Sequence, residues 1–85
     1  MARTRYEQVY HNRFIAQDAK NIGDMVRILE EKLALFKRWE EKGIQFDPHG
    51  SGASYAIFYT YDEQVAREEG FDRLRTESGN PLPRR

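Results

Sequence analysis

The segment Asp47-Pro48-His49-Gly50-Ser51-Gly52 holds the densest group of side chains that could do chemistry. Asp47 and His49 are metal-ligand types, but a zinc site needs three or four protein ligands, and the only other histidine is His11. These three side chains could bind a metal ion if the fold brought them together, but nothing in their spacing requires this. A turn explains the same residues, since Pro48 fixes one dihedral and the glycines allow positive ones. We therefore expect a loop here, with no metal and no cofactor.

Serine and phosphate chemistry are also disfavoured in this loop. Ser51 and Ser54 lie near His49 in sequence, but neither stands in a Gly-x-Ser-x-Gly elbow. Phosphate-binding glycine loops run from a strand into a helix, whereas this loop runs into a predicted strand. We expect no catalytic residues, and the sequence indicates a protein that is not an enzyme.

The aromatic run that follows the loop, Ala53 to Tyr61, is typical of a strand. Alternation divides it into two faces, one with Tyr55, Ile57, Tyr59 and Tyr61, the other with Ala56, Phe58 and Thr60. Both faces carry large apolar groups. If helices cover one face, the other exposes aromatic surface unless the amino-terminal segment, the short helix or another chain covers it.

This patterning predicts a surface that binds another protein or a second copy of the chain. Trp39 is a further candidate, because a large ring with a polar nitrogen near a helix end often lies at an interface. The predicted partner-binding residues are Tyr55, Phe58, Tyr59, Tyr61 and Trp39.

A second hypothesis is single-stranded nucleic-acid binding, with bases stacked on the strand aromatics and arginines that contact phosphates. The candidate arginines are Arg3, Arg5, Arg13, Arg84 and Arg85. The overall charge does not favour it, because 14 Lys and Arg balance 14 Asp and Glu. The strand itself contains no lysine or arginine.

The elements that must position these residues begin with a long helix from about Ile22 to Lys42. Asn21 is a suitable N-cap, and Gly43 can supply the left-handed residue that ends the helix. Apolar residues recur at spacings of three and four, which predicts a broad apolar face. We favour core packing for this face over a partner groove or a cofactor wall. The members of this face are Ile22, Met25, Val26, Ile28, Leu29, Leu33, Leu35, Phe36 and Trp39.

Shorter elements flank this helix. Ile44 to Phe46 and Ala53 to Tyr61 predict a β-hairpin with a loose loop, and a short helix follows to about Glu69, with Thr60 and Asp62 as competing N-caps. The segment from Tyr6 to Gln17 suits either a helix or a strand. We favour a strand, because a hairpin alone is barely stable and a third strand would complete a sheet.

The expected fold is a small two-layer α+β domain in the order strand, long helix, β-hairpin, short helix, with the sheet covered on one face by the long helix. At 85 residues, the chain has room for one core. We assign 1–72 to this domain and 73–85 to a polar tail with proline and arginine, expected to be disordered by itself.

The composition also bears on function and location. Cysteine is absent, which fits a reducing compartment, and no apolar run is long enough to span a membrane. We expect a cytoplasmic, non-enzymatic protein-interaction or assembly module, with nucleic-acid binding as the alternative.

Overall fold

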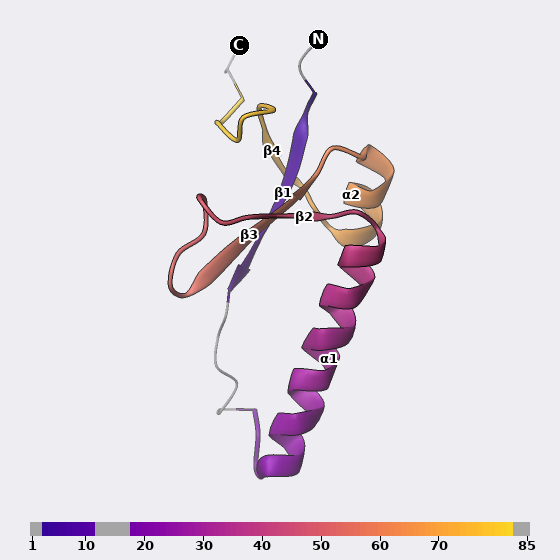
Figure 1. Cartoon of the computed structure of the whole chain (residues 1–85), viewed down its shortest axis with the longest axis vertical. Coiled ribbons are helices and arrows are strands. Elements are labelled where there is room, and N and C mark those ends of the chain that lie inside the picture. Colours follow the sequence, from indigo (N-terminus) through magenta and orange to yellow (C-terminus); the bar gives the residue numbers. More distant parts are fainter. Residues whose placement is uncertain (1–2, 12–17, 83–85) are drawn as a thin grey trace.

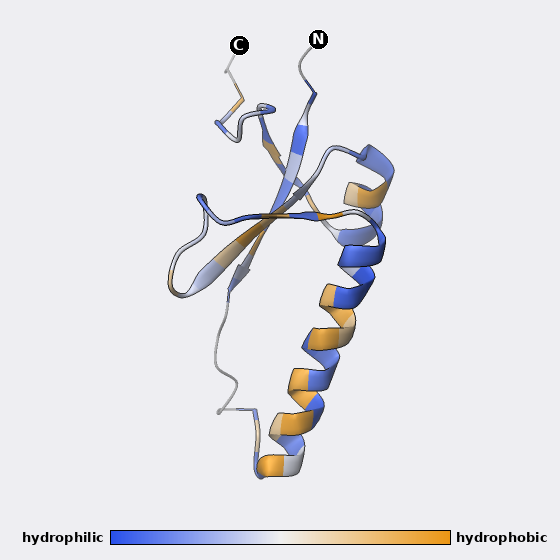
Figure 2. Ribbon diagram, viewed as in Figure 1, coloured by the Kyte–Doolittle hydropathy of each residue, from blue (hydrophilic) through white to orange (hydrophobic). Residues whose placement is uncertain are grey.

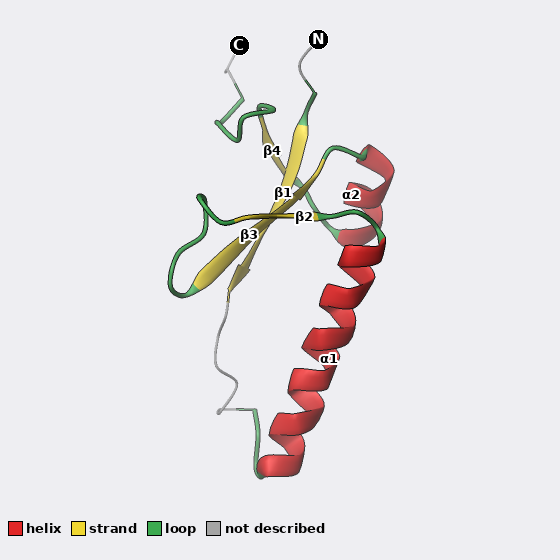
Figure 3. Ribbon diagram, in the orientation of Figure 1, coloured by secondary structure: helices red, strands yellow, loops and turns green. Residues whose placement is uncertain are grey.

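The computed structural model describes residues 3–11 and 18–82 of the 85-residue chain. It is an α+β domain with the predicted order of strand, long helix, hairpin and short helix (Figures 1 and 3). The elements in chain order are β1 (Arg5–His11), α1 (Ile22–Glu41), β2 (Gln45–Asp47), β3 (Tyr55–Thr60), α2 (Glu63–Glu69) and β4 (Arg73–Arg75).

The four strands form one antiparallel sheet in the order β2-β3-β1-β4. β1 lies in the centre, with Tyr6 opposite Thr60 on β3 and opposite Leu74 on β4. The amino-terminal segment is therefore a strand over Arg5–His11, and its helical alternative is wrong there. Residues 12–17 of the predicted segment lie outside the described residues.

The edge strand β4 lies in the segment that the sequence analysis assigns to a polar tail. Arg73–Arg75 pairs with β1, and Arg75 also forms a bridge with Pro81. A three-residue strand has little propensity of its own. It forms because β1 presents unpaired backbone groups beside it, which a scan of local sequence does not reveal.

Both helices begin and end at the residues expected to cap them. The Asn21 side chain accepts a hydrogen bond from the Asp24 amide, and the Asp62 side chain accepts from the amides of Gln64 and Val65. Asp62 is thus the N-cap of α2. Gly43 and Gly70 follow the two helices at φ of 76° and 78°, in the left-handed region that favours glycine.

The core lies where the carboxyl-terminal part of α1 crosses the sheet beside α2. Trp39, 4% exposed, packs with Ala66 and Phe71. Its ring centroid lies 5.1 Å from those of Phe58 and Phe71, in edge contacts. A small domain has few apolar residues to bury, so this group of interlocking rings supplies a large part of its stability.

A group of polar contacts joins the end of α1 to the end of α2. The Glu69 carboxylate, 6% exposed, accepts hydrogen bonds from Trp39 Nε1 at 3.0 Å and from Arg38 Nη2 at 2.9 Å, and pairs with Lys42 Nζ at 2.8 Å. The hydrogen bond from Lys42, followed by those from Trp39 and Arg38, lowers the pKa of Glu69 from 4.5 to about 2. These contacts hold this end of α1 in place.

The other end of α1 projects beyond the sheet (Figure 1). A 20-residue helix is about 30 Å long, whereas the six or seven residues of β3 and β1 extend over about 20 Å. The molecule measures 51 × 24 × 21 Å, and its radius of gyration is 15.0 Å, against about 12 Å for a compact domain of this length. The long helix therefore covers one face of the sheet only with its carboxyl-terminal part.

Candidate interaction surface

The projecting half of α1 exposes a row of large apolar side chains, which we call the α1 stripe. It consists of Ile22, Val26, Leu29 and Leu33, which are 78%, 48%, 55% and 53% exposed. Their spacing of four, three and four residues places them on one side of the helix. Figure 2 shows the apolar residues along this side of α1. The arrangement is unusual, because a domain with so few apolar residues would be expected to bury them.

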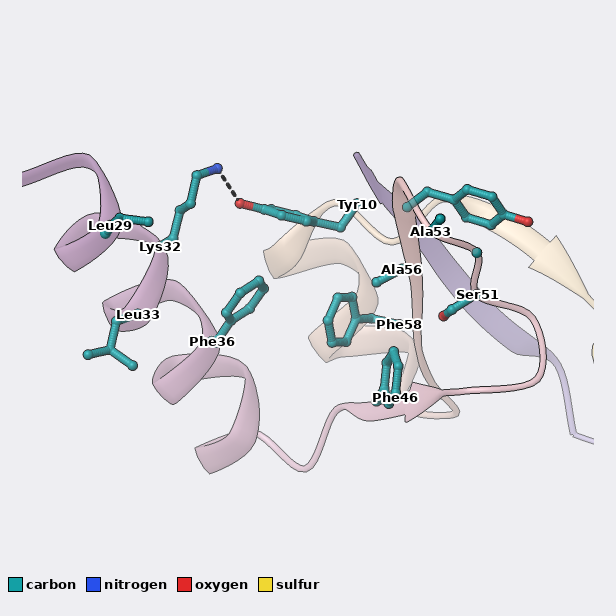
Figure 4. A pocket seen from close by; sticks show the side chains of 12 residues that line it. Tyr10, Leu29, Lys32, Leu33, Phe36, Phe46, Ser51, Ala53, Ala56 and Phe58 are labelled. Carbon is teal, nitrogen blue, oxygen red and sulfur yellow. Dashed lines mark hydrogen bonds between the residues drawn. The ribbon is translucent and has the colours of Figure 1, made fainter. Parts of the chain in front are cut away.

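The α1 stripe runs into a groove of about 520 Å³ between α1 and the β2–β3 hairpin. Leu29, Leu33 and Phe36 line one side of the groove, and Phe46 and Phe58 line the other. In Figure 4 the rings of Phe36, Phe58 and Tyr10 gather between the helix and the sheet, while Leu29 and Leu33 stand farther along the helix. Stripe and groove thus form one continuous apolar surface.

Two features of the groove wall define its character. Phe46 is 51% exposed although its ring lies 5.6 Å from that of Phe58, so one side of Phe46 packs against Phe58 and the other faces solvent. Lys32 donates a hydrogen bond to Tyr10 Oη at 2.6 Å, which leaves its charge at the edge of the apolar surface (Figure 4). The surface is therefore apolar in the middle and polar at its rim, as protein interfaces are.

The opposite face of the sheet is built around a buried arginine. The Arg5 side chain, 7% exposed, pairs with the carboxylates of Glu7 and Asp47, and its guanidinium lies 3.7 Å from the centre of the Tyr59 ring. The hydrogen bond from the Gly50 amide, followed by the pairing with Arg5, lowers the pKa of Asp47. This charged group occupies the middle of the face on which Tyr59 lies.

Parts of the same chain cover this opposite face. Gly50 lies over Ile57, since a Cβ built on Gly50 would be 3.5 Å from Ile57 Cγ1. In the turn after β4, a Cβ built on Gly79 would be 3.5 Å from the Arg5 guanidinium carbon, and Glu77 O accepts a hydrogen bond from Tyr61 Oη. The hairpin loop and the carboxyl-terminal turn therefore provide much of the cover, where the sequence analysis expected the amino-terminal segment, the short helix or another chain.

The predicted partner-binding residues consequently lie in three different environments. Trp39 belongs to the core and Phe58 packs against it, on the helix side of the sheet. Tyr59 and Tyr61 lie half-buried on the opposite face, where their rings are 5.6 Å apart. Tyr55, 39% exposed, stands at the end of β3 and lines the groove. The structure does not bring the five residues together into one patch.

The arginines suggested for nucleic-acid binding are engaged where the structure describes them. Arg3 pairs with Glu77 at 3.0 Å and lies over the Tyr61 ring, while Arg5 is buried with its two carboxylates. Arg13, Arg84 and Arg85 lie outside the described residues. The nucleic-acid hypothesis stays a prediction, now with Arg3 as its most exposed described residue.

The loop from Asp47 to Gly52 forms the predicted turn. Asp47 Oδ1 accepts hydrogen bonds from the amides of His49 and Gly50, each at 3.0 Å, and Ser51 Oγ accepts one from the Ile57 amide. Within residues 3–11 and 18–82, no three His, Asp or Glu side chains cluster closely enough to hold a metal ion. In the same residues, no helix is long and apolar enough to cross a membrane.

The sequence interpretation favoured core packing for the apolar face of this helix over a groove for a partner, and so did not predict the α1 stripe as a surface. The sequence signal that could have identified this surface was the length of the helix relative to the strands. An apolar pattern that continues from Ile22 to Trp39 needs a partner layer along the whole helix, and the predicted strands are too short to supply one. Comparing the two lengths would have identified the first half of the helix as unpartnered.

Comparison with known proteins adds no assignment. No protein-family model, curated protein or solved structure matches this chain.

Proposed function

We propose that this chain is a non-enzymatic assembly module that works in the cytoplasm and associates with itself through the α1 stripe and the adjoining groove. The observation that carries the proposal is the exposure of Ile22, Val26, Leu29 and Leu33 on a helix that projects past its own sheet. The absence of cysteine is consistent with a reducing compartment.

The energetics favour a partner for this surface. Burying a half-exposed Leu, Ile or Val side chain contributes about 1 kcal/mol, since full burial contributes about 1.5–3 kcal/mol. Four such residues from each copy, with Phe46 beside them, contribute about 10 kcal/mol, which offsets an association cost in the lower part of the range of about 4–15 kcal/mol. We therefore expect a weak complex, with a dissociation constant on the order of tens of micromolar or higher.

The charge balance is compatible with self-association. The formal net charge is zero at pH 7, so two copies do not repel each other through their overall field. The described edge strands β2 and β4 have three residues each, which limits association through strand addition. Among the described surfaces, the α1 stripe with its groove is the better-supported contact.

Light scattering over a concentration series tests the proposal. The unchanged chain should form dimers as its concentration rises, with little change at high salt. Val26→Ser combined with Leu29→Ser should weaken the dimer by roughly 1000-fold, because the two changes, present in both copies, remove four apolar contacts of about 1 kcal/mol each.

Two control variants separate this surface from others. Glu31→Ser changes the far side of α1, half a helical turn from the stripe, and should leave the dimer intact. Tyr59→Ser alters the aromatic strand on the opposite face of the sheet, away from the groove, and should weaken the dimer less than the stripe variant. A chain that stays monomeric at every concentration overturns the proposal, as does a dimer that Tyr59→Ser dissociates and the stripe variant does not. Binding to RNA or DNA that falls steeply with salt would favour the nucleic-acid hypothesis.

A further inference from the structure

The spacing of the α1 stripe indicates the type of contact that covers it. Ile22, Val26, Leu29, Leu33 and Phe36 follow each other at intervals of four, three, four and three residues. This is the alternation by which two helices pack side by side, with the apolar residues of each inserted between those of the other. A helix therefore fits this stripe better than a strand or an extended peptide.

We propose that two copies of this chain pair through α1 in antiparallel orientation around a two-fold axis, with Val26 of one copy beside Leu29 of the other and Ile22 beside Leu33. This inference rests on the proposed function and specifies its geometry. The four exposed residues of the stripe are centred between positions 27 and 28, so this register buries all of them in both copies. A two-fold axis makes the contact self-complementary and closes it at two copies.

The shape of the molecule favours the antiparallel orientation. The sheet and α2 lie at the carboxyl-terminal end of α1, and the amino-terminal end of α1 stands free of them (Figure 1). A parallel pair would bring the two sheets to the same end, where they compete for space. An antiparallel pair separates them and brings Ile22 of each copy to Leu33 of the other, at the mouth of the groove.

The charges beside the stripe point the same way. In a parallel pair, the residues that flank the apolar seam place Lys32 of one copy next to Lys37 of the other. In the antiparallel register, Lys32 flanks Met25 and Glu30 flanks Gly23, so no like charges meet at these flanking positions. The opposed helix dipoles are also favourable in this arrangement.

Engineered cysteines test this geometry, because the chain contains none of its own. Ile22→Cys and Leu33→Cys are made as separate single variants, and one of them carries a nitrogen-15 label. Positions 22 and 33 lie about 16 Å apart along the helix, so the orientations give different products. After mixing and mild oxidation, the antiparallel pair should yield disulfide dimers that contain one labelled and one unlabelled chain.

Two results would overturn the proposed antiparallel geometry. A parallel pair would link two Ile22→Cys chains or two Leu33→Cys chains to each other. A chain that forms a dimer, verified by mass in the reduced state, but no disulfide would also contradict the geometry. Glu31→Cys, on the far side of the helix, should form no dimer with either variant. A chain that remains monomeric overturns the proposed function itself, so the two failures are distinguishable.

Discussion

The two halves of α1 have the same apolar pattern and different surroundings. In the carboxyl-terminal half, Trp39 is buried among aromatic rings and hydrogen-bonded to Glu69. In the amino-terminal half, Ile22 and Leu29 are exposed on a helix that extends past the sheet. Amphipathic periodicity therefore predicts which side of a helix is apolar enough to be buried. It does not predict whether residues of the same chain bury that side.

The largest change in stability is expected for the carboxyl-terminal half of α1, which packs against the sheet and α2. Trp39→Ala should destabilise the fold by about 3–5 kcal/mol, because it leaves a cavity among the core rings and removes the donor to Glu69. Urea unfolding followed by circular dichroism measures this change. Since a small domain can lose its fold at that cost, Trp39→Phe is the second variant, and it should lose about 1–2 kcal/mol. A loss no greater than that of Leu29→Ala would erase the contrast between the halves.

A matched pair of leucines two residues apart sharpens the contrast. Leu35 packs against the core, whereas Leu33 is 53% exposed. Leu35→Ala should cost about 2 kcal/mol, and Leu33→Ala under about 1 kcal/mol in dilute protein. At concentrations where the chain pairs, the cost of Leu33→Ala should grow. Equal costs for the two variants at low concentration would contradict the assignment.

The polar contacts at the docked end predict a pH dependence. Glu69 has a pKa of about 2 in the folded protein, below its ordinary value of 4.5, because of its hydrogen bonds from Lys42, Trp39 and Arg38. The unfolded chain thus binds a proton first, and the stabilisation, complete above about pH 4.5, is lost as the pH falls towards 2. Acid unfolding should be less steep in Glu69→Gln, with Glu40→Gln as the control. An unchanged slope would argue against these contacts.

The smallest effect on global stability is expected at the free end. Asn21 caps α1, because its side-chain oxygen accepts a hydrogen bond from the Asp24 amide at 2.9 Å. Losing such a cap costs about 1 kcal/mol of helix stability. Because the projecting half can unfold locally, Asn21→Ala should speed hydrogen exchange of its amides while the half that carries Trp39 stays protected. Exchange that rises equally throughout α1 would mean that the two halves unfold together.

The local elements followed from the chain's own chemistry. Caps, glycine stops and periodicity predicted both helices closely, since each signal acts within a few residues. The loop of Asp47 and His49 also behaves as its turn residues indicate. These features do not depend on where the rest of the chain lies.

Other features of the fold depend on contacts between residues that are far apart in the sequence. Arg73–Arg75 became a strand only because β1 offers it a free edge, and Arg5 became a buried residue only because Glu7 and Asp47 meet it from two strands. A single sequence does not encode such pairings locally, and a charged arginine by itself is typical of a solvated surface.

The sequence by itself determined that α1 has one broad apolar side, because side-chain positions on a helix follow directly from its period. Only the tertiary structure decided where that side is covered. The sheet reaches Phe36 and Trp39 and stops short of Ile22 and Val26, because strands of this length end before a 20-residue helix does. The proposed contact surface arises from that difference in length.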